Sequence, residues 1–535
     1  MPKLFALLLL ATLQSAHAGV TATLSLASAD TLSIRYDIPA SCQALTFVNG
    51  GIRPQDAQAM RANWRASDDC ASIDGKGMQR SGATCEALQF TVPASTLQLD
   101  RVYPWAFPMG GAIYSHTSAF EVDTSCGPVT WKFSAPKGTV VLNGAAYPDN
   151  VSAASAQWLP VIFMERPHTG RSYVDARLSK PTSAFVSDTV QRTFDLYGRL
   201  LPGLDVDSAF VAITLSQDPR SFGGDVAAHS TIRLSVPASL PAPMEMDIHG
   251  YLAHEVAHMH QPMKWNDSWR DQPMIDEGGA DLLRWIALAQ LAWADQAYLK
   301  QYMDTAFNGC LIAAQGNSWN ATAERGWGKA PYQCGLAFHA IGLAARSAQA
   351  PATTVLRDYY RAGRSGAATD FASALECGAK AGCHARWLNR IAGAEPVAAV
   401  FSDYARSGGF LKVADTASTT VLEPVMRDVI GQLMRIDCHG QVSFYDNPGM
   451  LLIGPVGQCA VLREGMSIVT AQGQPLYAGV AVIASVLDAC AGKGAVSLGL
   501  KDGTAIELGC SAASVRAPAE LFEVDVARLR TLLGV

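Results

Sequence analysis

The sequence predicts a multidomain α+β protein, and three observations lead to this class. The chain has 535 residues, enough for two to four domains at roughly 100–200 residues each. Its first and last parts alternate apolar and polar residues in short runs between glycine-rich turns, as β-strands do. Its middle part repeats apolar residues at helical spacing. We therefore expect an N-terminal β-sandwich, a central α/β plus helical domain and a C-terminal β domain.

The first eighteen residues are expected to be a signal peptide. Lys3 supplies a positive charge, Leu4 to Leu13 form a short apolar stretch, and Ala16-His17-Ala18 matches a signal-peptidase site. An uncleaved anchor or a buried N-terminal strand is the alternative. No later stretch is apolar over the roughly 20 residues that a spanning helix needs. We therefore expect a periplasmic or secreted protein without a transmembrane helix after signal cleavage.

The cysteines agree with export, because disulfides persist in oxidising compartments. Their number is even, and no C-x-x-C occurs, which argues against a thiolate metal site. Reduced core cysteines are the alternative. Connectivity does not follow from sequence alone, so six pairings are hypotheses: Cys42–Cys126, Cys70–Cys85, Cys310–Cys334, Cys377–Cys383, Cys438–Cys459 and Cys490–Cys510.

Residues 19–150 are expected to form the N-terminal β domain. The run "TLSIRY" places Leu32, Ile34 and Tyr36 on one face of a strand, and "VTWKF" repeats this pattern around Trp131. Turn-rich segments such as "DGKG" and "PMGG" separate these runs. Nothing in this part combines residues that carry chemistry.

Residues 151–414 are expected to form the central domain. Phe185, Val186, Val190 and Phe194 have helical spacing, and Pro202-Gly203 ends that helix. The run "FVAITL" follows as a strand, and residues 240–412 read as mostly helical. The formal net charge is −6 and no Lys/Arg tract occurs, so nucleic acid is not an expected partner.

The central domain contains the motif H-E-x-x-H. His254 and His258 are four residues apart, so on a helix both imidazoles reach one metal ion from the same face. Glu255 lies beside that pair, where its carboxylate can take a proton from water. The motif alone also arises by chance on solvent-facing helices.

Two acidic residues strengthen the motif. Glu277 follows after eighteen intervening residues and would supply a third ligand, the number that a catalytic zinc site takes from protein. Asp281 lies one helical turn later and could accept the remaining N–H of a ligand histidine, which fixes the tautomer. The alternative for Glu277 is an acid that favours the start of a helix.

This combination resembles the gluzincin zinc metallopeptidases, with the pattern HExxH-x18-E. The spacing is similar to the aminopeptidase-N and glycyl-aminopeptidase-like branches, which carry a Pro-Tyr-x-x-Gly segment downstream. Here "APYQCG" supplies Pro331, Tyr332 and Gly335. The resemblance implies a thermolysin-like α/β plus helical catalytic domain with one Zn²⁺ held by His254, His258 and Glu277. It also implies Glu255 as the catalytic base and Tyr332 as the donor to the oxyanion of a peptide or protein substrate.

The chain departs from the family upstream of the zinc helix. Aminopeptidases of this branch bind the substrate amine with a glutamate that follows a glycine pair or lies in a Gly-x-Met-Glu-Asn segment. Gly223 and Gly224 match, but Asp225 is the only acid in "SFGGDVAAHSTIRLS". A plain turn residue is the alternative for Asp225. The sequence therefore does not decide between an aminopeptidase and an endopeptidase.

Residues 415–535 resemble a PDZ domain of the bacterial type. In "LREGMSIVTAQGQPL", Gly465, Ile468, Gly473 and Pro475 match the usual pattern. The resemblance implies a C-terminal PDZ-like β domain in which Gly449-Met450-Leu451 forms the peptide-binding loop and strand and could take a peptide C-terminus. A purely structural module is the alternative.

Two other functions are alternatives to the exported zinc peptidase. One is a catalytically inactive, zinc-stabilised peptide-binding protein, for which an intact Glu255 and Tyr332 would be unnecessary. The other is a zinc hydrolase acting on a non-peptide ester or epoxide.

Overall fold

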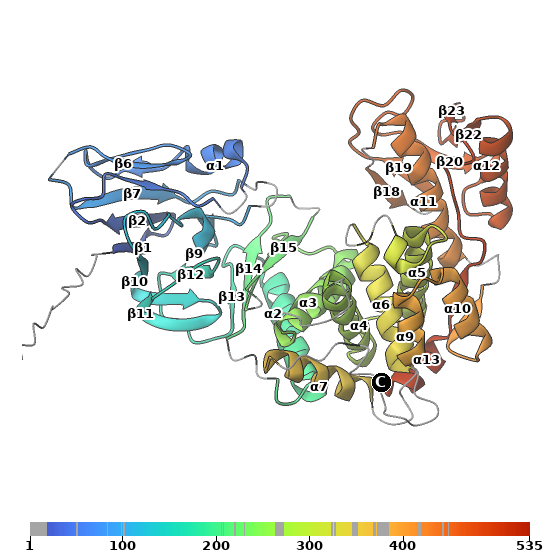
Figure 1. The fold of residues 1–535 in the computed structure, drawn as a ribbon, viewed down its shortest axis with the longest axis horizontal. Coiled ribbons are helices and arrows are strands. Elements are labelled where there is room, and N and C mark those ends of the chain that lie inside the picture. Colours follow the sequence, from blue (N-terminus) through green and yellow to red (C-terminus); the bar gives the residue numbers. More distant parts are fainter. Residues whose placement is uncertain are drawn as a thin grey trace, which may run out of the picture. The chain divides into compact units, whose positions relative to one another are not determined.

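The computed structural model is a mixed α/β protein with two compact units (Figure 1). The first unit comprises Met1–Asp188 and Val206–Pro241, and the second comprises Thr189–Asp205 and Ala242–Val535. The predicted signal peptide and the Cys377–Cys383 pair lie outside the described residues. The structure describes residues 19–535 with these gaps: 50–51, 83, 98, 100–101, 205, 207, 219–220, 229, 263–271, 323–324, 326–327, 345–350, 367–370, 372–384, 415–418, 441–442 and 448.

The first unit contains a nine-stranded sheet whose strands alternate as the sequence predicts. In β2 (Thr31–Asp37), the side chains of Leu32, Ile34 and Tyr36 are fully buried, while the intervening residues face outward. The sheet runs in the order β4-β7-β2-β1-β10-β12-β9-β8, with β11 paired to β10. The other bounds are β1 Val20–Ser28, β4 Arg65–Ala66, β7 Ala87–Pro93, β8 Phe107–Pro108, β9 Ala112–His116, β10 Val129–Leu142, β11 Ala145–Ala153 and β12 Pro160–Met164.

Two smaller sheets and a short helix complete the first unit. Strands β13 (Ser172–Val174), β14 (Phe210–Leu215) and β16 (Thr231–Val236) are parallel, and β15 (Gly223–Ala227) pairs antiparallel with β16 at the edge. The predicted strand "FVAITL" is β14. The remaining elements are α1 Pro54–Arg61, β3 Ala44–Thr46, β5 Ala71–Ile73 and β6 Gly77–Arg80.

The second unit is mainly helical. Of its helices, α3 (Ala242–His260) is mostly buried from Ile248 onward, and α4 (Gln272–Gln290) and α6 (Ala330–Ala344) are buried along most of their length, which explains their long apolar runs. None of the helices in the described part of the chain is long and apolar enough to cross a membrane. The other helices are α2 Lys180–Leu200, which begins in the first unit, α5 Gln296–Ala314, α7 Ala352–Arg364, α9 Ala385–Ala392, α10 Val397–Arg406, α11 Thr419–Asp437 and α13 Val526–Leu533.

The end of the second unit contains a sheet in the order β18-β19-β20-β22-β23, with β21 paired to β20. Helices α11 and α12 (Val480–Gly492) share an apolar core with this sheet. Asp502 and Gly503 form the predicted turn between β22 and β23. The bounds are β18 Phe444–Asn447, β19 Met450–Ile453, β20 Ser467–Ala471, β21 Gln474–Pro475, β22 Ala495–Leu500 and β23 Ala505–Gly509, and a separate pair joins β17 Leu411–Val413 to β24 Phe522–Val524.

The predicted peptide-binding strand does not lie at a free edge of its sheet, so this part of the prediction is wrong. Met450–Ile453 pairs with β18 on one side and with β20 on the other. Strand addition needs a free sheet edge, and the edge strands here are β18 and β23. The PDZ-like assignment of residues 415–535 stays a prediction.

Five disulfides form with the expected pairings. They are Cys42–Cys126, Cys70–Cys85, Cys310–Cys334, Cys438–Cys459 and Cys490–Cys510. Cys310 lies in α5 and Cys334 in α6, so this bond ties together two helices that position the candidate site.

Candidate metal centre

Helices α3 and α4 bring three potential metal ligands together. The Nε2 atom of His254 lies 3.0 Å from Nε2 of His258 and 3.1 Å from Oε2 of Glu277. The third distance, from Nε2 of His258 to Oε2 of Glu277, is 3.3 Å. The histidines converge because they are one turn apart on α3. Glu277 reaches them from α4, which packs on α3.

The three donor atoms fit a zinc ion. Metal–ligand bonds of 2.0–2.1 Å in a tetrahedral site place ligand atoms about 3.3 Å apart, close to the three distances of this cluster. Two imidazoles and one carboxylate are also a donor set that zinc prefers in catalytic sites. Both imidazoles present Nε2, because Nδ1 of each ring is engaged elsewhere.

Asp281 orients the first histidine. Its Oδ1 lies 2.8 Å from Nδ1 of His254, as a partner that fixes the tautomer of the ring would. Arg284 lies 3.9 Å from the same carboxylate and stacks 4.8 Å from the ring centroid of Tyr302. The Arg284 side chain packs closely on Gly250, where a Cβ would lie 2.7 Å from its Nε and would require the guanidinium group to shift.

Gln261 orients the second histidine, His258. Its Oε1 lies 2.7 Å from Nδ1 of His258, and its Nε2 donates to the backbone oxygen of Asp276 at 2.7 Å. The amide is therefore held with its oxygen toward the ring. Gln261 directly follows α3, where its backbone N–H donates to the carbonyl of His258.

Hydrogen bonds and neighbouring charges, acting against burial, set the charges of the cluster. Desolvation alone would lower the pKa of His254, but the carboxylates of Asp281 and Glu277 reverse this and raise it to about 9. Desolvation would likewise raise the pKa of Glu277, yet hydrogen bonds from His254 and His258 bring it down to about 2. Glu277 is therefore ionised at neutral pH, and a metal ion that binds the cluster must displace the proton of the His254 imidazole.

Glu255 and Tyr332 lie in the cavity beside the ligands. Desolvation by burial raises the pKa of Glu255 above its ordinary value. The ring of Tyr332 stacks 5.8 Å from that of His254, the residue is 37% exposed, and its hydroxyl forms a hydrogen bond with Glu277. Burial and the carboxylate of Glu277 raise the pKa of Tyr332, which keeps the phenol protonated.

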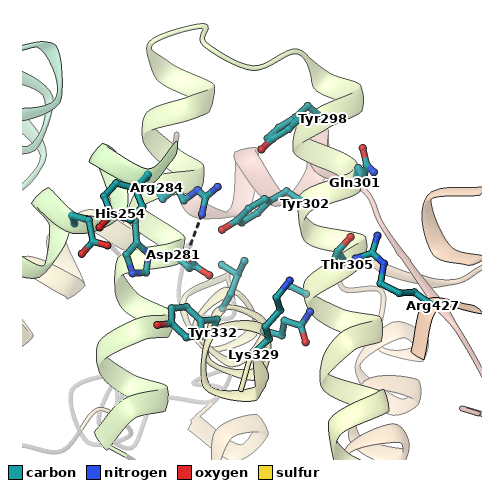
Figure 2. Close-up of a pocket in the computed structure, with 15 residues that line it drawn as sticks. His254, Asp281, Arg284, Tyr298, Gln301, Tyr302, Thr305, Lys329, Tyr332 and Arg427 are labelled. Carbon is teal, nitrogen blue, oxygen red and sulfur yellow. Dashed lines mark hydrogen bonds and ion pairs between the residues drawn. The ribbon is translucent and has the colours of Figure 1, made fainter. Parts of the chain in front are cut away.

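The cavity has a volume of about 590 Å³ and lies entirely within the second unit (Figure 2). Volumes of roughly 300–1,000 Å³ are typical of pockets for small ligands. Helix α3 lines it with His254 and Glu255, α4 with Asp281 and Arg284, and α6 with Tyr332. Further lining residues come from α5, from the turn directly before α6 and from α11: Tyr298, Gln301, Tyr302, Thr305, Lys329 and Arg427.

Asp225 has a different environment. It lies in β15 of the first unit, where Nε of Arg233 donates to its Oδ1 at 2.8 Å and the hydroxyl of Tyr114 donates to its Oδ2 at 3.0 Å. Both carboxylate oxygens are engaged within its own unit. These bonds argue against an amine anchor, and the alternative of a plain turn residue is wrong as well, because Asp225 lies within the strand β15.

Three residues of the site were not singled out from the sequence. Gln261 offered no signal beyond its position just after H-E-x-x-H. Arg284 is one turn after Asp281, so helical spacing could have suggested it. Tyr302 lies on another helix, and burial together with the Asp281 carboxylate raises its pKa far above the ordinary value.

No protein-family model and no characterised protein sequence matches the chain. Among solved structures, the chain is similar to an M1 zinc metallopeptidase from Deinococcus radiodurans, with 14% identity, a TM-score of 0.38, and coverage of 71% of this chain and 95% of that one. It is also similar to yeast LTA4 hydrolase in complex with bestatin, with 13% identity, a TM-score of 0.34, and coverage of 64% and 61%. Aminopeptidase A of Legionella pneumophila, in complex with aspartic acid, shows 10% identity, a TM-score of 0.40, and coverage of 93% and 57%. Similarities this low assign no activity.

Proposed function

We propose that the protein is an exported zinc peptidase that hydrolyses peptide bonds in the cavity of the second unit. One observation carries the proposal: three zinc-type donors lie 3.0–3.3 Å apart, and the carboxylate of Glu255 and the phenol of Tyr332 line the cavity beside them. The proposed ligands are His254, His258 and Glu277. A purely structural zinc site has four protein ligands and no open position.

A bound zinc ion supplies electrophilic activation of a carbonyl and makes a water molecule more acidic. Glu255 then takes the proton of the attacking water and passes it to the leaving amine. The hydroxyl of Tyr332 donates a hydrogen bond to the oxyanion that develops on the substrate carbonyl. Asp281 and Gln261 keep both imidazoles in the tautomer that presents Nε2 to the metal.

Substituting Glu255→Gln tests this assignment. We expect the variant to bind one zinc ion per chain, because Glu255 is not a ligand, and to lose at least a hundredfold in turnover of peptides. Glu245→Gln is the matched control, since Glu245 is exposed on the first turn of the same helix. Near-normal peptide cleavage by the Glu255 variant would contradict the proposal.

The substrate panel should contain free and N-acetylated peptides, together with an ester and an epoxide. Cleavage of free peptides alone would indicate an aminopeptidase, and cleavage of both would indicate an endopeptidase. Zinc-dependent turnover of only the ester or the epoxide would support the non-peptide hydrolase instead. Zinc binding without any turnover would support the inactive peptide-binding protein.

A further inference from the structure

The proposed metal ligand His258 lies in the last turn of α3, where the backbone needs partners from outside the helix. Carbonyl groups in the last turn of an α-helix accept no bond from within that helix. The carbonyl of His258 accepts the N–H of Gln261 at 3.1 Å. The carbonyl of Met259 accepts a bond from Nη2 of Arg364 at 2.5 Å, and Arg364 is the last residue of α7. Helix α7 therefore supplies a cation to the C-terminal end of the metal-binding helix, where the helix dipole favours one.

A second side chain of α7 reaches the group that orients His258. The hydroxyl of Tyr360 lies 3.4 Å from Nε2 of Gln261, whose Oε1 lies 2.7 Å from Nδ1 of His258. An amide nitrogen has two N–H groups. One is directed to the backbone oxygen of Asp276 at 2.7 Å, which leaves the other for the Tyr360 hydroxyl. Tyr360 and Gln261 are both buried, and a buried hydrogen bond is costly to lose because the remaining partner stays desolvated.

Gly279 in α4 makes room for the Tyr360 hydroxyl. A Cβ at Gly279 would lie 2.6 Å from the hydroxyl oxygen of Tyr360 and 3.1 Å from Nε2 of Gln261. Gly279 is two residues after the proposed ligand Glu277. The hydroxyl of Tyr360 thus contacts both segments of the chain that carry the proposed metal ligands.

The end of α7 is itself held in place by close contacts. A Cβ at Gly363 would lie 2.8 Å from Cγ of Pro262, so this end of α7 packs directly on the residue where the chain leaves α3. Nη2 of Arg361 donates to the carbonyl of Pro202 at 2.9 Å. Helix α7 therefore gives Tyr360 and the end of α3 a fixed support.

Resting on the proposed zinc site, we infer that Tyr360 and Arg364 are positioning residues that hold His258 in its metal-binding orientation from α7. Arg364 fixes the end of α3 through the carbonyl of Met259, and Tyr360 fixes the amide of Gln261 that bonds the ring. Neither side chain is part of the cavity lining in the described part of the chain. Their effect therefore reaches the site through His258 and should appear as a change in metal affinity.

The zinc affinity of Tyr360→Phe tests the first residue. The variant keeps the ring and loses only the hydroxyl, and its Kd for zinc should rise about three- to tenfold, since a single hydrogen bond contributes on that order. Tyr359→Phe is the matched control, because it removes the same group from the next residue of α7, whose buried ring packs 5.3 Å from that of Phe371. Competition of the full chain with a chromophoric chelator gives each Kd.

The same measurement on Arg364→Gln tests the second residue. Loss of the guanidinium group from the carbonyl of Met259 should raise the Kd for zinc by a similar factor, about three- to tenfold. Arg357→Gln is the control on the same helix, since Arg357 pairs with the adjacent Asp358 at 2.7 Å. Its Kd should equal that of the unsubstituted protein.

A residue that only supports the fold has a different signature. Urea unfolding is measured without zinc and at a fixed free zinc concentration well above the Kd. Zinc stabilises the folded chain according to the ratio of its free concentration to the Kd. A purely structural substitution lowers both stabilities equally. Tyr360→Phe and Arg364→Gln should in addition reduce the difference between them.

A double-mutant cycle tests the contact between Tyr360 and Gly279. Gly279→Ala should push the hydroxyl of Tyr360 away from Gln261 and raise the Kd for zinc. In the Tyr360→Phe background the displaced oxygen is absent, so the added Gly279→Ala should change the Kd much less.

An unchanged Kd in Tyr360→Phe or in Arg364→Gln, an equal change in the matched control, or additive effects in the cycle would overturn the inference. Failure of the proposed zinc site is distinguishable from these outcomes. In that case the unsubstituted protein binds no zinc, and the positioning role falls together with the site.

Discussion

The backbone of Gly278 in α4 lies against the backbone of Gly335 in α6. A Cβ added at Gly335 would lie 2.7 Å from Cα of Gly278, and one added at Gly278 would lie 2.7 Å from the carbonyl oxygen of Gly335. Gly278 directly follows Glu277, and Gly335 is three residues after Tyr332. The contact therefore sets how close the proposed metal ligand lies to the proposed oxyanion donor.

The substitution Gly335→Ala should lower both stability and activity. Overpacking of this kind costs about 1–3 kcal/mol, and it would push α6 with Tyr332 away from α4. Gly198→Ala is the opposite case, since Gly198 lies in α2 with nothing near its Cβ position. It should stabilise the protein by about 0.5–1 kcal/mol. Urea unfolding and peptide turnover measure both effects, and equal behaviour of the two variants would refute the role of the contact.

Removing the amide of Gln261 should weaken zinc binding. Partners that orient ligand histidines contribute about 10–100-fold to metal affinity, so Gln261→Ala should raise the Kd for zinc by that factor. Gln261→Glu retains the acceptor oxygen and should lose less. Gln290→Ala, at the exposed end of α4, is the control. Competition with a chromophoric chelator gives the Kd, and an unchanged value for Gln261→Ala would show that His258 needs no such partner.

The sequence allowed many of the elements and the proximity of His254 to His258 to be predicted, because both depend on local spacing. The four-residue step from His254 to His258 becomes a shared helix face wherever that helix forms. The role of Gln261 could not be predicted, since its contact with His258 depends on how the chain turns after α3. The position of Arg427 at the cavity could not be predicted either, because only tertiary packing brings α11 there. The interior position of Met450–Ile453 likewise depends on pairing with β18, which strand periodicity does not specify.

Loss of the Cys310–Cys334 disulfide should reduce stability and disturb the cavity together. The bond closes a loop with a sequence separation of 24, for which chain entropy predicts about 3 kcal/mol. Replacing both cysteines by alanine should also lower peptide turnover, because α5 and α6 lose their link beside Gln333. The Cys490–Cys510 pair, with a separation of 20, is the control. Its removal should cost similar stability but leave turnover unchanged, and a loss of turnover in both variants would argue against a specific role.

His116 should make the first unit sensitive to acid. Its ring is buried, stacks 4.1 Å from the ring of Tyr103 and bonds the hydroxyl of Ser118 at 2.7 Å through Nδ1. Desolvation lowers the pKa of His116 from 6.5 to about 4. Between these two values the unfolded chain binds a proton that the folded chain does not. The stabilising contribution of the neutral ring is therefore complete above pH 6.5 and is lost as the pH falls toward 4.

The expected loss from His116 is about 3 kcal/mol between pH 7 and pH 4, because each pKa unit corresponds to 1.36 kcal/mol. The variant His116→Gln keeps a polar side chain but has no proton to gain in this range. Its stability at pH 7 should be lower than that of the unsubstituted protein, since stacking on Tyr103 is lost. Its further loss on acidification should be smaller by about 3 kcal/mol. Urea unfolding at both pH values measures this difference, and parallel losses in the two proteins would show that another group controls acid stability.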